Sequence, residues 1–172
     1  MEYSTVVNML DACGFFPEIG ISRLEDRSLV TRSDNMIGMH DLIQEMGWHI
    51  VNEESPEEPG GRSRLWKYED IYHTHTKKTK QSVEAIVLDS HETKEISLSP
   101  DAFSEMNKLR LLKLSNVQLP NGLNYLSNDL CLLDWDRYPL KYLPSNFLPD
   151  CLVKLKLSRS CLKQLWNGRR MV

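Results

Sequence analysis

The chain has 172 residues, of which 41% are hydrophobic and 26% are charged, and its formal net charge is −3. This composition is typical of a folded globular protein and excludes a disordered tail, while the length allows one medium domain or two small ones. Residues 1–80 carry 9 Lys and Arg against 14 Asp and Glu. That balance argues against a nucleic-acid partner, because binding phosphates requires clustered cations.

The sequence also indicates a compartment. No apolar run is long enough to span a bilayer, so we expect no membrane partner. The cysteines form neither a CxxC pair nor a metal-ligand spacing, and His73 and His75 lack acidic or Cys partners at ligand spacing. We therefore expect no metal site and a reducing location, the cytoplasm, with the nucleus as a second compartment.

Residues 1–54 are predicted to form helices around one β-hairpin. In chain order we expect a helix ending at Cys13, a helix over 20–26, strands over 28–31 and 36–39 joined by Ser33-Asp34-Asn35, and a third helix. Helices followed by a hairpin and another helix predict a winged-helix subdomain. About 50 residues of this layout give a marginal core, so we expect it to pack on neighbouring structure.

The third helix begins at a Met39-His40-Asp41 junction. Apolar residues then recur on one helical face, at Leu42, Ile43, Met46, Ile50 and Val51. Asp41 occupies an N-cap or first-turn position. His40 would lie beside backbone N–H groups that the helix leaves unsatisfied, where proteins often hold phosphate.

Residues 55–80 are predicted to be a linker with one short helix. Pro, Gly and charge interrupt all periodicity over 55–61, which ends the third helix. Trp66, Ile71 and Tyr72 are expected to anchor the short helix. The polar, basic segment from Thr74 to Lys80 is typical of a loop.

Residues 81–172 contain an internal repeat. Starts at 83, 109, 130 and 152 are separated by 26, 21 and 22 residues, within the range of leucine-rich repeats. We expect four strands whose alternate residues enter a stacked core: Ile86 and Leu88, Leu112 and Leu114, Leu133 and Trp135, Leu155 and Leu157. A short helix is expected over 101–109. The position usually held by a bridging Asn is Val117, Tyr138 and Cys161, so the asparagine ladder of such repeats is missing.

The alternation of the strands also predicts a binding surface. Residues between the core positions, among them Lys113, Asp134, Asp136 and Lys156, should lie on the concave side. Their mixed charge suits a protein partner or a contact with another part of the same protein.

Several strings together resemble plant intracellular immune receptors of the nucleotide-binding, leucine-rich-repeat class that carry an N-terminal TIR domain. The strings are LDACGF at 10–15, MHDLIQEMG at 39–47, RSRLW at 62–66 and LDWDRYPL at 133–140. The resemblance covers nearly the whole chain. It implies a mixed α/β fold, with a winged-helix subdomain followed by the N-terminal part of a leucine-rich-repeat solenoid.

The resemblance also implies a role for the Met39-His40-Asp41 junction. His40 would face the β-phosphate of ADP held in a preceding nucleotide-binding module, Asp41 would stabilise the helix start, and Met39 would pack beneath. The sequence has no Gly-x-x-x-x-Gly-Lys-Ser/Thr loop and no TIR-like segment. We therefore expect an interior or truncated piece of a receptor, in which ADP or ATP binds only with the missing module.

The favoured function is thus a non-catalytic, ADP-sensing latch joined to the start of a protein-recognition array in defence signalling. Its partners would be the nucleotide-binding module and a pathogen effector or guarded host protein. A truncated modulator or decoy of full-length receptors is the alternative. A winged-helix DNA binder is a lesser one, because residues 22–27 would offer DNA a nearly neutral mixture of charges. No nucleophile–base set or paired carboxylates indicate an enzyme.

Overall fold

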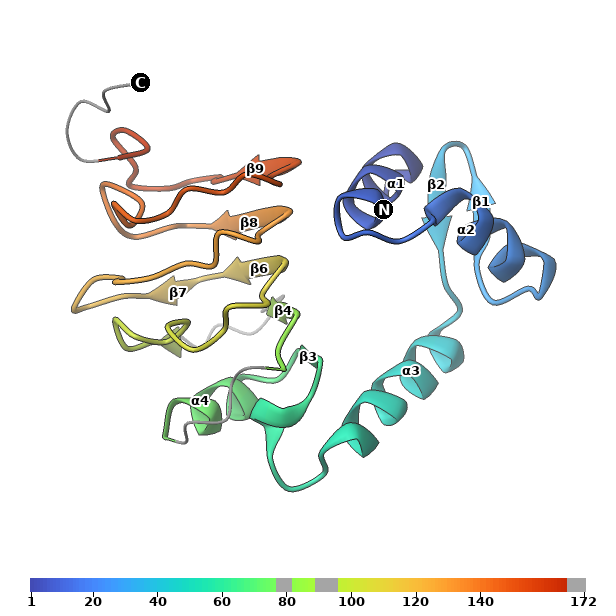
Figure 1. The fold of residues 1–172 in the computed structure, drawn as a ribbon, viewed down its shortest axis with the longest axis horizontal. Helices are drawn as coiled ribbons and strands as arrows, with labels where there is room; N and C mark the ends of the chain where they lie inside the picture. Colours follow the sequence, from blue (N-terminus) through green and yellow to red (C-terminus); the bar gives the residue numbers. More distant parts are fainter. Residues whose placement is uncertain (77–81, 89–95, 167–172) are drawn as a thin grey trace. The chain divides into compact units, whose positions relative to one another are not determined.

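The computed structural model describes residues 1–76, 82–88 and 96–166 and divides the chain into two compact units, Met1–Glu53 and Glu54–Val172 (Figure 1). The first unit holds the helices and hairpin of the expected winged helix. The second holds a stack of parallel strands. The fold is therefore the predicted mixed α/β arrangement of a winged-helix unit and a repeat solenoid.

The first unit opens with two short helices, α1 (Tyr3–Ala12) and α2 (Pro17–Asp26). Gly14 takes a left-handed φ of 78° just after α1, as expected for a residue that ends a helix. The second helix begins three residues earlier than predicted. Proline fits the first helical position, because its missing N–H would have no partner there.

The hairpin consists of β1 (Thr31–Ser33) and β2 (Met36–Gly38), which pair antiparallel. Its turn has two residues, Asp34 and Asn35, both with left-handed φ, where we expected three. Two left-handed residues match the twist of a tight hairpin, so Ser33 remains in the strand. The amino-terminal residues then pair with the other edge of β2, through Met1 O to Ile37 N at 2.8 Å and a bridge from Glu2 to Met36.

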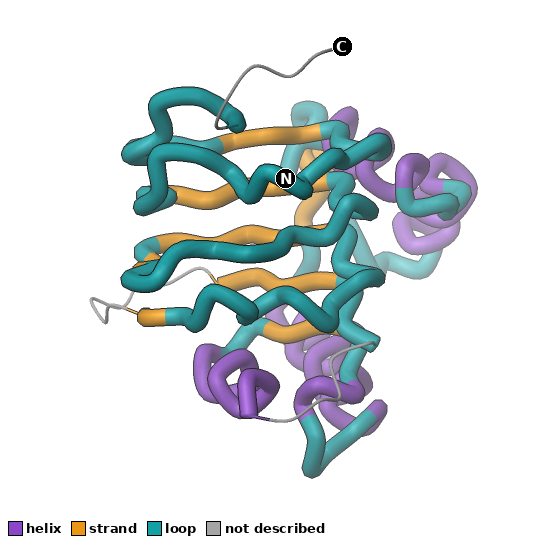
Figure 2. The backbone as a smooth tube through the Cα atoms, turned by 60° about the vertical axis from the view of Figure 1, so that its left-hand side comes forward, coloured by secondary structure: helices purple, strands orange, loops and turns teal. Residues whose placement is uncertain are grey.

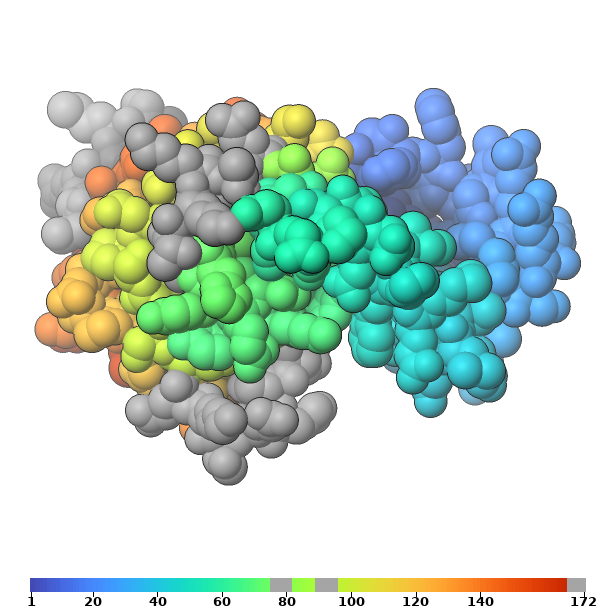
Figure 3. All heavy atoms as spheres, turned by 90° about the horizontal axis from the view of Figure 1, so that it is seen from below, coloured from blue at the N-terminus to red at the C-terminus, as the bar shows by residue number. Residues whose placement is uncertain are grey.

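The third helix, α3, spans Asp41–Glu54 as predicted, but most of its apolar face is exposed. Val51 is buried, whereas Leu42 is 67%, Met46 50% and Ile50 58% exposed. In the space-filling view the α3 side chains, coloured cyan, lie at the surface (Figure 3). Most of the predicted apolar face of α3 is therefore not covered by its own unit.

The second unit is built on a parallel sheet of order β3-β4-β6-β8-β9. These strands span Arg64–Leu65, Ala85–Leu88, Leu111–Ser115, Leu132–Asp136 and Lys154–Lys156. Figure 2 shows them stacked one above another as successive rungs. A second small sheet pairs β5 (Ile96–Ser97) with β7 (Val117–Gln118). All four predicted repeat strands are present, one in each repeat.

The core of this unit consists of the alternate strand residues that the repeat predicted. Leu112, Leu133 and Ile86 are fully buried, and Ile86, Leu112, Leu133 and Leu155 stand in one register row. In the last strand Leu155 is 39% exposed. Burial therefore fades toward β9, as it should where one side of a stacked repeat has no described neighbour.

Trp135 is the largest side chain in this core. Its ring contacts Phe103 edge-on at 6.2 Å between centroids and Tyr138 at 5.0 Å. Tyr138 occupies the position where a repeat usually carries Asn, and its hydroxyl donates to the carbonyl of Tyr142 at 2.9 Å. Burial raises the pKa of the Tyr138 hydroxyl, so this group remains a donor at any physiological pH.

The segment 101–109 is not the helix that we predicted. It forms successive turns closed by bonds between residues three apart, such as Met106 N to Phe103 O at 3.0 Å and Leu109 N to Met106 O at 3.1 Å. Its apolar residues Ala102, Phe103, Met106 and Leu109 are nonetheless buried. The apolar spacing was interpreted correctly as a packed face, but a chain of tight turns presents the same face as a helix.

The range 55–80, expected as a linker, joins the repeat unit more closely than we predicted. The short helix is present as α4 (Tyr68–Thr76), with Ile71 buried and Tyr72 53% exposed, and a 3-10 turn spans Pro59–Gly61. Strand β3 pairs with β4 and so adds a rung to the sheet. Residues 77–81 of the expected loop lie outside the described residues, as do the last six residues of the chain.

Arg62 organises the start of this unit. Its side chain is nearly buried and donates to the carbonyls of Ser55 at 2.8 Å and Pro56 at 2.7 Å and to the carboxylate of Asp70 at 3.1 Å. The Glu54 carboxylate accepts from the backbone N–H of Ser63 at 2.6 Å. These bonds fold 54–63 into a closed loop, which we call the Arg62 loop.

Candidate functional site

The first candidate site is the start of α3, where His40 is the N-cap residue. The His40 carbonyl accepts from Ile43 N at 2.9 Å and Gln44 N at 3.1 Å, and its Nδ1 accepts from Leu42 N at 3.2 Å. Asp41 is therefore the first-turn acid of the helix, one of the two positions considered for it. The imidazole takes the capping role that Ser, Thr, Asn or Asp usually fills.

This capping bond determines which ring nitrogen of His40 carries the proton in the neutral form. Because Nδ1 accepts a hydrogen bond, the ring proton of neutral His40 resides on Nε2, which makes Nε2–H the available donor. The side chain is exposed and stands at the positive end of a 14-residue helix. A donor in this position can meet an anion such as a phosphate oxygen.

Met39, the residue expected to pack beneath His40 in the intact receptor, is 48% exposed in this chain. The reason is local: it follows β2 on a segment of irregular backbone that carries the chain into α3. Asp41 is likewise exposed.

The exposed apolar side of α3 is the second notable feature of the first unit. Leu42, Met46 and Ile50 lie on it at helical spacing. Contiguous exposed apolar side chains of this size mark contact surfaces. The same unit carries nine acidic and three basic residues, a net charge of −6, and Arg32 is paired with Glu25 at 3.3 Å. This charge argues against DNA as the partner of the surface.

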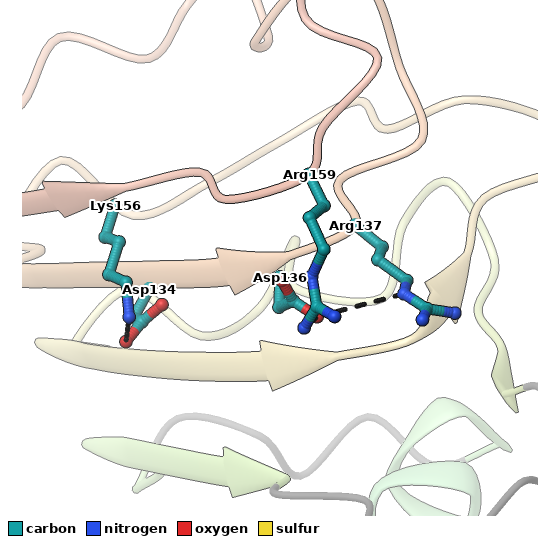
Figure 4. A network of polar contacts seen from close by, with 5 residues as sticks. All are labelled: Asp134, Asp136, Arg137, Lys156 and Arg159. Carbon is teal, nitrogen blue, oxygen red and sulfur yellow. Dashed lines mark hydrogen bonds and ion pairs between the residues drawn. The ribbon is translucent and has the colours of Figure 1, made fainter.

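The second candidate site is the outward face of the parallel sheet, which we call the strand surface. Lys113, Asp134 and Lys156 stand in one register row across β6, β8 and β9. The Lys156 Nζ lies 3.8 Å from an Asp134 carboxylate oxygen (Figure 4). The structure therefore brings together the residues that the sequence placed on this side, with Asp136 two residues along from Asp134.

Sequence reasoning missed two residues of this surface, Arg137 and Arg159. Arg159 donates from Nε and Nη2 to the two carboxylate oxygens of Asp136, at 2.8 and 2.5 Å, and the Nε of Arg137 lies 4.0 Å from the same carboxylate (Figure 4). The hydrogen bonds that Arg159 donates to Asp136, together with the negative charge of that carboxylate, raise the pKa of the Arg159 guanidinium. The repeat itself held the signal, because the two arginines are 22 residues apart, as are the starts at 130 and 152.

Among the described residues there is no group of three or more His, Cys, Asp or Glu that could hold a metal ion. In that same part of the chain, no helix has the length and apolar character needed to cross a membrane.

Comparison with known proteins now bears on both sites. The family described as "Disease resistance protein Roq1-like, winged-helix domain" matches residues 1–55, which include all three helices of the first unit, the hairpin and His40. Disease resistance protein RPP2A of Arabidopsis thaliana is 42% identical over 95% of the chain. The resemblance of the chain to part of the TIR-class disease resistance proteins of plants is confirmed.

Two grapevine relatives extend this result. Disease resistance proteins RUN1 and RPV1 of Vitis rotundifolia are 40% and 39% identical over 96% of the chain. The chain spans only 13–15% of the length of these relatives. In this family, then, the chain corresponds to a winged-helix domain and the adjoining repeats.

Proposed function

We propose that this chain is part of an intracellular plant immune receptor and contains a regulatory latch, in which His40 helps to hold an ADP-bound, inactive state. The supporting observation is the geometry of His40, an exposed imidazole whose Nδ1 is engaged and whose Nε2–H is available at the N-terminus of α3. One such donor adds a charge-assisted contact to a phosphate oxygen. It does not form a complete nucleotide site.

The residues fit ADP as one side of a shared site. The sequence offers no glycine-rich phosphate loop, so the remaining contacts would come from a nucleotide-binding module. Bound ADP would supply a fixed negative charge to which His40 could bond. Asp41 would support the helix start through its position in the first turn.

The exposed side of α3 fits the same proposal. Leu42, Met46 and Ile50 would be covered by the module that carries the nucleotide, which would bury apolar area in the closed state. Release of ADP would remove the bond to His40. A contact of about 1.5–3 kcal/mol to a charged group changes a balanced two-state equilibrium by tenfold or more.

In this proposal the repeat unit is a protein-recognition surface, and the chain acts in the cytoplasm without catalysis. Its strand surface would contact an effector, a guarded host protein or another part of the receptor. The recognition role is supported by the mixed charge of Lys113, Asp134, Asp136 and Lys156 on an exposed sheet face.

The test uses substitutions at His40 in the intact receptor. His40→Ala should raise signalling without effector and speed the loss of bound ADP. His40→Ser is the informative control, because Ser restores the N-cap but cannot supply the Nε2–H donor. If His40 acts through the nucleotide, Ser should behave like Ala.

His49→Ala, at an exposed position of the same helix, should leave both readouts unchanged. Rescue by Ser would show that only the helix cap matters. Normal ADP retention and normal basal signalling in His40→Ala would refute the latch.

A further inference from the structure

Two arginines from successive repeats converge on one carboxylate at the strand surface. Asp136 lies at the end of β8, Arg137 follows it directly, and Arg159 reaches it from the turn after β9 (Figure 4). One negative charge thus faces two positive charges. The side chains of Arg137 and Arg159 are 57% and 68% exposed, while that of Asp136 is 17% exposed.

The backbone gives no reason for arginine at either position. Arg137 has φ 58° and Arg159 has φ 51°, both left-handed, and Asn116 with φ 57° stands at the same place one repeat earlier. Backbone bonds join each of these turns to the next repeat, from Asn116 N to Asp136 O at 3.3 Å and from Arg137 N to Ser158 O at 2.8 Å. Gly or Asn adopts such a conformation more readily than Arg, so the reason for arginine must lie in its side chain.

A contribution of these ion pairs to the stability of the fold does not explain the two arginines either. Ion pairs between exposed side chains contribute little, because water screens the charges and the long side chains lose entropy. Arg159 engages two of its five N–H groups with Asp136, and Arg137 approaches the same carboxylate only to 4.0 Å. Both guanidinium groups therefore have donors to offer a further acceptor.

The surroundings favour an acidic ligand. On the strand surface of β6, β8 and β9 and in the turns after them, five cationic side chains accompany the two carboxylates of Asp134 and Asp136. The cations are Lys113, Arg137, Lys154, Lys156 and Arg159. Together these seven side chains carry a net charge of +3.

We propose that Arg137 and Arg159 form a binding site for a carboxylate side chain on an acidic segment of a protein partner, with Asp136 as the residue that positions Arg159. Guanidinium groups bind carboxylates through paired N–H donors, which gives geometric selectivity as well as charge. This proposal says which chemical group the strand surface recognises on its partner, and it therefore rests on the recognition role proposed above. Single-stranded nucleic acid fits poorly, because the strand residues offer it no aromatic stacking platform.

The experiment measures binding of a short, fluorescein-labelled peptide of alternating Glu and Ser to the whole 172-residue chain. Fluorescence anisotropy at about 0.15 M salt reports the affinity. The double variant R137Q/R159Q should weaken binding about tenfold. The matched control K108Q/K141Q removes the same charge from exposed positions elsewhere in the repeat unit and should change affinity less than about twofold.

A second pair separates guanidinium geometry from charge. R137K/R159K keeps both charges but loses the paired donors. We expect it to weaken binding about threefold, which is half of the effect of R137Q/R159Q on a logarithmic scale. Equal weakening by the control pair, full affinity of the lysine pair, absence of peptide binding to the wild type, or tighter binding of a labelled oligothymidylate would each overturn the proposal. None of these results bears on the His40 experiment, which reads nucleotide retention in the intact receptor.

Discussion

The winged-helix unit and the repeat unit solve the problem of burying apolar residues in different ways. Residues 1–53, all of them described, bury four large hydrophobic side chains: Met9, Ile21, Val30 and Val51. The described part of the repeat unit buries a single cluster of 23. The first unit leaves eleven large hydrophobic residues exposed, among them four on α3, against four in the described part of the second.

In a repeat array each strand is covered by the strand of the next repeat, whereas a small helical unit contains no such second copy. Each strand of the stack buries its inward residues against the next strand along, so the core grows with every repeat. The winged-helix unit has about 50 residues and too little volume to cover its helices. Its apolar surface therefore remains partly exposed, among others at Leu42 and Ile50.

Trp135→Ala gives the strongest test of the self-contained core. Removing a fully buried ring that contacts Phe103 and Tyr138 should destabilise the repeat unit by about 3–5 kcal/mol. Chemical unfolding followed by far-UV circular dichroism measures this loss. Leu148→Ala, at a half-exposed position, is the control and should cost less than about 1 kcal/mol. Equal losses would mean that the core is not the source of stability.

Arg62→Ala tests whether the start of the repeat unit is as firmly built as its centre. The change leaves the Asp70 carboxylate and two carbonyls without their nearly buried partner, so we expect a loss of about 2–4 kcal/mol. Amide hydrogen exchange should accelerate at Ser63 and along the Arg62 loop. Lys67→Ala removes an exposed cation just outside the loop and should leave exchange there unchanged. Slow exchange in Arg62→Ala would show that the loop is held by other contacts.

The smallest effect is expected on α3 and sharpens the contrast between the units. Leu42→Gln and Ile50→Gln replace exposed apolar residues with a good helix former, so each should change the stability of this chain by no more than about 0.5 kcal/mol. Val51→Gln, at the buried position of the same helix, should cost more than about 1 kcal/mol. In the intact receptor the two surface variants should instead raise effector-independent signalling. A large loss of stability in the isolated chain would show that α3 is already packed.

Much of this architecture could be predicted from the sequence because it depends on spacing. The intervals of 21–26 residues located every repeat strand, and alternation within strands assigned residues such as Leu112 and Lys113 to opposite faces correctly. Spacing could not distinguish two backbone conformations that bury the same side chains. The turns over 101–109 bury Phe103 and Met106 as a helix would, and only their hydrogen bonds distinguish the two.

The sites were harder to predict than the fold. An apolar stripe such as that of α3 indicates that a face will be covered, but it does not say whether the covering residues belong to the same compact unit. Arg137 and Arg159 were missed because the left-handed turns that bring them to Asp136 have no distinctive residue. The capping bond of His40 could not be predicted either, since histidine is an unusual N-cap.

The Arg62 loop restricts how many residues the chain can have between α3 and β3. Surface loops generally accept added residues at little entropic cost. Here one guanidinium holds two consecutive carbonyls and a carboxylate from α4, while Glu54 holds the backbone of Ser63. An inserted residue would move one set of partners away from the other. The segment that looked most like a flexible tether thus acts as a spacer of fixed length, with little tolerance for insertion or deletion.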